Sequence, residues 1–331
     1  MKKIAINGMG RIGRASLKVI LDTPELNLVA VNDIVSIENI AYLLKYDSVY
    51  GIYEKEVSHD ENNLIVDGKK IEYNSQRNPE DLPWASHEID VVIESTGFFT
   101  KSEDAKKHIK AGAKSVIISA PTKSEDIPTV VHGVNTEAGE TNIFSCASCT
   151  TNNISPVVEV LGRRVGIKKA IMTTVHAYTA SQGIVDAPSQ KNMRMRRAGA
   201  ANIVPTSTGA AIATTKALPE FAGKFDGVAL RVPIPVGSMS DLTFVTERDV
   251  TPEEINAIFK EEAATDRYKN ILDTTDQPLV SSDIVKNPHA STVDLGMTRV
   301  VDGDLLKVMT WYDNEWGFTN QMIRQILAEI K

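Results

Sequence analysis

The stretch Lys3-Ile4-Ala5-Ile6-Asn7-Gly8-Met9-Gly10-Arg11-Ile12-Gly13-Arg14 decides the fold of the first half of the chain. A short apolar strand runs into three glycines spaced G-x-G-x-x-G, and apolar residues at helical spacing follow them. Glycines at Gly8, Gly10 and Gly13 allow a tight turn and let a pyrophosphate approach the N-terminus of the helix. Glycines also mark plain turns, so the pattern gains its force from the strand–turn–helix context.

The next strand supports a dinucleotide site. The apolar run Leu28–Val31 ends at Asn32-Asp33, and Asp33 lies 20 residues beyond Gly13. A carboxylate at that spacing suits a ribose diol. Further along, the apolar runs 90–94 and 115–118 alternate with a helical pattern over 102–109. Such alternation predicts a parallel sheet with helices on both faces and a ligand beyond the carboxyl ends of the strands.

The second half has a different pattern. Segments 168–179, 228–232, 241–247 and 305–311 are predicted to be longer strands with few helices between them, which indicates an α+β domain with a mostly antiparallel sheet. We therefore expect a Rossmann-type dinucleotide-binding domain at 1–148 and a second, α+β domain at 149–316. A helix at the C-terminus, placed in segment 317–331, is expected to pack back on the first domain and complete it.

Composition narrows the classes of protein. The chain has 331 residues, a net charge of −7, and 42% hydrophobic and 24% charged residues, which is ordinary for a globular protein. The charge gives no reason to expect nucleic-acid binding, and no apolar run is long enough for a membrane span. The N-terminus passes directly into a strand, so we expect no signal or transit peptide. Two cysteines argue against a disulfide scaffold and favour the cytoplasm.

Cys149 is the candidate nucleophile. It lies between hydroxyl residues, just before apolar residues at helical spacing from Ile154 onward, and residues 150–153 suit a helix cap. We expect the N-terminus of a helix there to lower the pKa of the thiol. A buried, inert cysteine is an equally weighted interpretation of this segment alone. The spacing Cys146-x-x-Cys149 also fits a zinc ligand pair or a dithiol, although a second ligand pair and the surrounding pattern for either are missing.

His176 is the candidate base. It lies in segment 170–179, a strand of otherwise buried or hydroxyl residues, whereas the other histidines lie in more polar surroundings. A catalytic thiol requires such a partner. A core histidine with one hydrogen bond is the alternative, and the sequence gives no distance between His176 and Cys149.

The chain resembles phosphorylating glyceraldehyde-3-phosphate dehydrogenases along its whole length. Besides the glycine-rich opening, motifs in family order are Leu44–Ser48, Glu94–Gly97, Ala147–Asn152, Thr173–His176, Pro205–Ala211, Arg231–Pro233 and Trp311–Glu315. The resemblance implies oxidation of D-glyceraldehyde 3-phosphate with NAD and inorganic phosphate. It also implies a homotetramer, in which loop 180–205 lies beside a neighbour's cofactor.

The resemblance also implies residue roles. Cys149 would form a hemithioacetal and then a thioester, and His176 would activate the thiol. The residues expected around the substrate phosphate and the attacking phosphate are Ser148, Thr150, Thr179, Arg197, Thr208, Gly209 and Arg231. The residues expected at the cofactor are Gly8, Gly10, Arg11, Ile12, Gly13, Asp33, Arg77, Thr96, Ser119 and Asn314. Asp33 and Pro188 favour NAD over NADP, whereas the small Ala187 weakens that preference slightly.

Some positions depart from the family. Cys146 stands where many members carry Asn, and Asn153 where many carry a second Cys. We therefore hypothesise that Cys146 resolves an oxidised Cys149. The departures at Gly183, Phe318 and 234–237 bear on subunit contacts and cofactor affinity.

Two other functions stay open at this stage. The first is a sister enzyme acting on erythrose 4-phosphate, against which the phosphate set Thr179, Arg197, Thr208 and Arg231 argues. The second is a non-catalytic NAD- or RNA-binding protein, which need not keep both Cys149 and His176.

Overall fold

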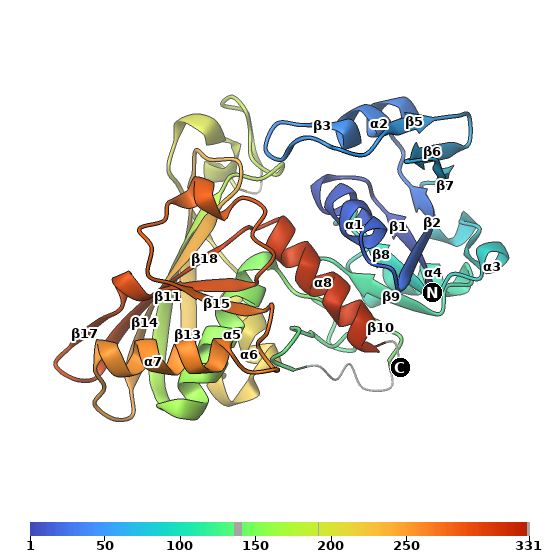
Figure 1. Ribbon diagram of the computed structural model, residues 1–331. Helices are drawn as coiled ribbons and strands as arrows, with labels where there is room; N and C mark the ends of the chain where they lie inside the picture. The colour runs from blue at the N-terminus through green and yellow to red at the C-terminus, as the bar shows by residue number, and fades with distance from the viewer. Residues whose placement is uncertain (136–140, 191, 330–331) are drawn as a thin grey trace. The chain divides into compact units, whose positions relative to one another are not determined.

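The computed structural model describes residues 1–135, 141–190 and 192–329. It divides into two compact units. Unit 1 contains residues 1–130, the described part of 136–147, and residues 322–329. Unit 2 contains Val131–Asn135 and Ser148–Gln321. Each unit is built around its own sheet (Figure 1).

Unit 1 is built on an eight-stranded sheet in the order β10-β9-β8-β1-β2-β7-β6-β5. The strands from β10 to β7 are parallel, as the alternating pattern predicts. Helices α1 and α4 pack against β2 and β9. The bounds of these elements are β1 Lys2–Asn7, α1 Arg11–Leu21, β2 Leu26–Asn32, α2 Ile37–Lys45, α3 Trp84–His87, β8 Val91–Glu94, α4 Ser102–Lys110, β9 Ser115–Ile118 and β10 Ile143–Ser145.

The sequence analysis did not predict the strands of segment 46–74. A small pair, β3 (Tyr46–Asp47) and β4 (Gly51–Ile52), precedes three strands that extend the main sheet: β5 (Val57–His59), β6 (Asn63–Val66) and β7 (Lys69–Asn74). Strands β6 and β7 form a hairpin across Asp67-Gly68, whose φ values are +46° and +77°. Positive φ at both residues is the type I′ geometry that Asp-Gly favours, so this turn was a usable signal.

Unit 2 is built on a mixed sheet in the order β12-β13-β11-β14-β18-β16-β15, with β17 beside β18. Most pairs are antiparallel, as predicted, but β11 pairs with β13 and β15 with β16 in parallel. The strands are β11 Ile167–Ala177, β12 Val204–Ser207, β13 Phe225–Val232, β14 Ser238–Thr246, β15 Leu272–Thr275, β16 Ser291–Asp294, β17 Arg299–Val301 and β18 Leu305–Tyr312.

Helices α5 (Cys149–Arg164), α6 (Ala210–Ala217) and α7 (Pro252–Ala263) pack against this sheet. Alternate residues of β14 are fully buried, and the core includes Leu161, Phe244 and Phe259. Helix α7 is capped by Thr251, whose side chain accepts the backbone N–H of Glu254.

Two helix starts differ from the prediction. Helix α5 begins at Cys149, so the predicted cap residues 150–153 lie in its first turn, and Pro156 lies inside the helix. The helix is buried at 150–161, so packing outweighs the cost of the proline. Helix α8 (Trp316–Glu329) begins one residue before the predicted segment 317–331, because the Asp313 carboxylate accepts the N–H groups of Glu315 and Trp316.

The predicted long loop at 180–205 is largely irregular where described, with short 3₁₀ turns at Arg194–Arg196 and Gly199–Ala201. None of the described helices is long and apolar enough to cross a bilayer.

Candidate active site

The structure places Cys149 at the first residue of α5. The chain leaves β10, turns at Ala147 with a left-handed φ of +60°, and enters the helix through its cap, Ser148. The Ser148 hydroxyl accepts the N–H of Thr151 at 3.1 Å. The thiol therefore lies beside backbone N–H groups that have no partner within the helix.

Strand β11 brings His176 to this thiol. The Sγ atom of Cys149 lies 3.4 Å from Nε2 of His176. The other ring nitrogen, Nδ1, lies 2.7 Å from the carbonyl oxygen of Ala177. When Nδ1 carries the proton, it donates to that carbonyl and the Nε2 lone pair faces the sulfur, which is the tautomer that a base requires, whereas the Nη1 atom of Arg231, 2.7 Å from Nδ1, favours the opposite tautomer. Cys149 is partly exposed, whereas His176 is buried.

The electrostatics correct one expectation. Burial raises the pKa of Cys149, and it outweighs the lowering by Arg231 and by the helix N–H groups. The N-terminus of α5 alone therefore does not give a thiolate. Burial, with the positive charge of Arg231, lowers the pKa of His176 to about 3. Each group alone resists ionisation, but a proton moved from Sγ to Nε2 would create opposite charges in contact, whose attraction opposes the cost of burial.

Tyr312 packs beside Cys149 and His176, and it was not predicted from the sequence as a site residue. Its hydroxyl contacts the Thr150 hydroxyl at 2.9 Å and the Thr174 hydroxyl at 2.8 Å. Its ring meets the His176 ring edge-on, with centroids 5.9 Å apart. Its place at the end of β18, directly before Asp313-Asn314, was the available signal. These contacts fix the plane of the imidazole.

Arg231 lies against His176 because β13 and β11 pair in register at these two residues. Its Nη1 atom is 2.7 Å from Nδ1 of His176 and donates to the carbonyl oxygen of Ala177 at 3.2 Å. Its buried Nε–H has no partner among the described residues. A buried guanidinium donor without an acceptor suits an anionic ligand.

A second anion-binding feature lies at the start of α6. Gly209 caps this helix, and the space around its Cα is open. The Thr208 hydroxyl accepts the N–H of Ala210. Ser155 and Thr214, inside α5 and α6, are in hydrogen-bond contact at 3.3 Å, which holds the two helices together. The backbone N–H groups at the N-terminus of each helix favour a negative ligand.

Two predicted phosphate residues have other partners here. The Thr179 hydroxyl contacts the Ser181 hydroxyl at 2.9 Å. Arg197 forms an exposed ion pair with Asp186 at 2.8 Å. No contact joins either residue to Cys149 within the described part of the chain, so both stay predictions.

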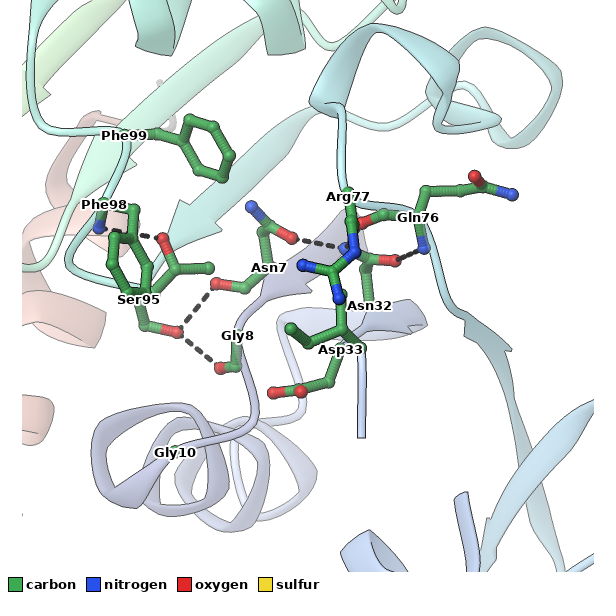
Figure 2. A pocket seen from close by; sticks show the side chains of 12 residues that line it. Asn7, Gly8, Gly10, Asn32, Asp33, Gln76, Arg77, Ser95, Phe98 and Phe99 are labelled. Atoms are coloured by element: carbon green, nitrogen blue, oxygen red, sulfur yellow. Dashed lines mark hydrogen bonds between the residues drawn. The ribbon is translucent and has the colours of Figure 1, made fainter. Parts of the chain in front are cut away.

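Unit 1 holds a pocket of about 580 Å³ at the carboxyl ends of β1, β2 and β8 (Figure 2). The predicted residues that line it are Gly8, Gly10, Asp33, Arg77 and Thr96. The further lining residues are Asn7, Asn32, Ile34, Gln76, Ser95, Phe98 and Phe99. The strand ends signalled the polar members, whereas Gln76 and the two phenylalanines lie in loops without a periodic signal.

The glycines fit a dinucleotide. A Cβ on Gly13 would lie 1.9 Å from the carbonyl oxygen of Gly8, and Gly8 itself has a φ of +99°. Gly10 has open space around it, as close approach of a ligand requires. The Asp33 carboxylate is fixed by the N–H groups of Met9 at 2.6 Å and Val35 at 3.0 Å.

The other predicted cofactor residues lie outside the lining of this pocket. Arg11 and Ile12 begin α1, and Arg11 pairs with Asp47 at 2.6 Å. Ser119 follows β9, where its N–H donates to the carbonyl of Glu94. Asn314 lies in unit 2, where its Oδ1 atom accepts from Gly237 and Ser238.

Cys146 is a poor candidate for resolving an oxidised Cys149. It is 2% exposed, and burial raises the pKa of its thiol. Both cysteines are free thiols. The buried thiol gives little thiolate for attack on a neighbouring sulfur.

Comparisons with known proteins agree with this geometry. Residues 2–102 match the family model described as "Glyceraldehyde 3-phosphate dehydrogenase, NAD binding domain", and residues 148–314 match the corresponding C-terminal domain. The glyceraldehyde-3-phosphate dehydrogenase of Streptomyces coelicolor is 49% identical over 97% of this chain and 96% of its own length. Glyceraldehyde-3-phosphate dehydrogenase 1 of Bacillus subtilis is 49% identical with the same coverage, and the Geobacillus stearothermophilus protein is 48% identical.

Proposed function

The chain belongs to the glyceraldehyde-3-phosphate dehydrogenase family, and from this premise we propose that it oxidises and phosphorylates D-glyceraldehyde 3-phosphate. The oxidant is NAD, the second substrate is inorganic phosphate, and the product is 1,3-bisphosphoglycerate. The observation that carries the proposal is the 3.4 Å contact between Cys149 Sγ and His176 Nε2 at the start of α5.

The chemistry follows from the pair. Cys149 attacks the aldehyde carbon while Nε2 of His176 takes the thiol proton and then donates it to the oxyanion of the adduct, which gives a hemithioacetal and returns His176 to its neutral form. His176 then removes the hydroxyl proton of this adduct. NAD, when bound, supplies the acceptor for the hydride that leaves the same carbon. The thioester on Cys149 is cleaved by inorganic phosphate, which releases the acyl phosphate and the free thiol.

The same residues stabilise developing charge. The oxyanion of the tetrahedral adduct is expected to accept hydrogen bonds from the backbone N–H of Cys149 and from protonated His176. Thr150 and Tyr312 keep the imidazole and the first turn of α5 in place. Such preorganised donors require no rearrangement during the reaction.

Two anion sites serve the two phosphate groups. Arg231, with Thr179 and Arg197, would bind the phosphate of the substrate. Ser148, Thr208 and Gly209, at the starts of α5 and α6, would bind the attacking phosphate. The buried Nε–H of Arg231, which has no partner among the described residues, supports the first assignment, and the N–H groups at the starts of α5 and α6 support the second.

NAD is bound by unit 1, and the carboxylate at Asp33 disfavours a 2′-phosphate. We assign the NAD-binding domain to 1–148 with 317–331 and the catalytic domain to 149–316; these bounds follow the two compact units, except that 131–135, Ser148 and 317–321 belong to unit 2. Arg11, Ile12 and Ser119 would contact the cofactor from the borders of the pocket, and Asn314 its carboxamide.

We further propose a cytoplasmic homotetramer. Strands β11 and β13 carry exposed apolar residues, Ile171 at 62% and Val228 at 50% exposure, on the sheet. Loop 180–205 exposes Ile184, Val185, Met193 and Ile203. Apolar surface of this kind is typical of an interface between subunits.

The function is tested by NADH formation with D-glyceraldehyde 3-phosphate, NAD and phosphate, and again with arsenate in place of phosphate. We expect turnover in both cases and at most one equivalent of NADH without either anion. A higher kcat/KM with erythrose 4-phosphate would instead assign the sister activity. NAD binding without turnover on either aldehyde would point to a non-catalytic protein.

A further inference from the structure

A buried carboxylate lies beneath the dinucleotide pocket of unit 1. Glu94 ends β8 and is 1% exposed. Its Oε2 atom accepts from Nδ2 of Asn7 at 2.6 Å and from Nε2 of His108 at 3.0 Å. Its Oε1 atom accepts the N–H of Thr96 at 2.8 Å and also the Thr96 hydroxyl. Both oxygens are thus occupied by donors, as a buried carboxylate requires.

The contact with His108 is a hydrogen bond from a neutral imidazole. The indole N–H of Trp84 donates to Nδ1 of His108 at 3.0 Å, and both side chains are fully buried. An indole nitrogen can only donate, so Nδ1 carries no proton and Nε2–H faces Glu94. All four hydrogen bonds to Glu94 therefore come from neutral donors.

The bonds to Glu94 position both sides of the pocket. On one side Thr96 lines the pocket, and its hydroxyl oxygen accepts the N–H of Phe98, another lining residue, at 3.1 Å. On the other side Asn7 presents Oδ1 to Asn32 at 2.7 Å, and Asn32 binds the backbone of Gln76 through both ends of its amide (Figure 2). Because Glu94 accepts from Nδ2 of Asn7, it determines which way that amide faces.

We propose that Glu94 is a positioning residue for NAD: its carboxylate sets the shape of the dinucleotide pocket through Asn7 and Thr96. The proposal rests on the assignment of this pocket to NAD. A glutamine at this position has one acceptor oxygen and one NH₂ group. That NH₂ must face either the Thr96 donors or the Asn7 and His108 donors, so one side of the pocket loses its anchor.

Glu94→Gln should raise the dissociation constant for NAD about tenfold or more, which is the usual effect of losing hydrogen bonds to a charged group. Direct titration of the purified protein with NAD, followed by calorimetry, measures it. The KM for NAD should rise more than kcat falls. Glu262→Gln is the matched control, because Glu262 is an equally buried carboxylate in unit 2, paired with Arg163 and Arg164. It should lower the melting temperature without changing NAD affinity.

A second pair of variants keeps the test decisive should Glu94→Gln fail to fold. His108→Gln can donate to Glu94 and accept from Trp84, so NAD affinity should stay within about twofold of wild type. His108→Met fills similar space without a donor and should weaken NAD binding severalfold. Wild-type NAD affinity in folded Glu94→Gln, or equal affinities in the two His108 variants, overturns the proposal. Failure of wild type to bind NAD would instead overturn the assignment of the pocket.

Discussion

His176→Asn tests whether the imidazole is what makes the Cys149 thiol reactive. The contact of 3.4 Å between Sγ and Nε2 sets the magnitude. Two unit charges at that separation attract by about 5 kcal/mol at an effective dielectric constant of 20. At about 1.4 kcal/mol per factor of ten, this allows a loss of at most roughly three and a half orders of magnitude in thiolate population. Solvent screening at the partly exposed sulfur reduces it, so we expect a loss of roughly ten- to a thousandfold.

The assay is alkylation by iodoacetamide, with the second-order rate constant measured across pH. In the proposed mechanism, the thiolate of the wild type forms by proton transfer to His176. In His176→Asn the thiol must ionise alone, and its pKa is raised by burial, so alkylation should still be increasing above the ordinary pKa of cysteine. Cys149→Ser gives the background from Cys146, which is buried. An identical pH profile in wild type and His176→Asn would refute the pairing.

Three further predictions address the cofactor and phosphate sites. Gly13→Ala should weaken NAD binding by about ten- to a hundredfold, because its Cβ would lie 1.9 Å from the Gly8 oxygen. The control is Gly10→Ala, whose Cβ meets open space. Equal NAD dissociation constants for the two variants would contradict the prediction. Asp33→Asn should raise the ratio of kcat/KM for NADP to that for NAD by about tenfold, since it removes a charge that repels a 2′-phosphate. An unchanged ratio would show that Asp33 does not discriminate between NAD and NADP. Arg231→Ala should raise the KM for D-glyceraldehyde 3-phosphate by about ten- to a hundredfold in steady-state kinetics. Cys149 should still be alkylated in this variant. An unchanged KM would exclude Arg231 from the substrate site.

Local signals predicted the first unit well where one short segment determines the structure. The turn after β1 requires glycine for steric reasons that hold in any context, and Asp33 follows at the end of the neighbouring strand. The hairpin of β6 and β7 was missed although Asp67-Gly68 fits its turn. The strands of this hairpin are short, and β7 is held in the sheet by its pairing with β2 and β6, which the local sequence does not indicate.

Long-range packing explains the remaining differences. Pro156 is accommodated inside α5 because the helix is buried on several sides, which no local propensity indicates. The pKa of Cys149 depends on burial and on Arg231, which is distant in sequence and reaches the site only through the pairing of β11 with β13. Arg197 was predicted to bind phosphate, but in the structure it forms an ion pair with Asp186 at the surface. Local motifs thus indicated the candidate residues for the chemistry, whereas the electrostatic surroundings of Cys149 and His176 required the tertiary structure.

Trapping of the acyl group on Cys149 tests the central claim most directly. Wild type is mixed with D-glyceraldehyde 3-phosphate and NAD in the absence of phosphate and arsenate, quenched in acid, and analysed by peptide mass spectrometry. We predict a burst of NADH with an acyl adduct confined to the Cys149 peptide, and release of that adduct when phosphate is added before the quench. NADH formation without an adduct, or an adduct that persists in Cys149→Ser, would contradict the account.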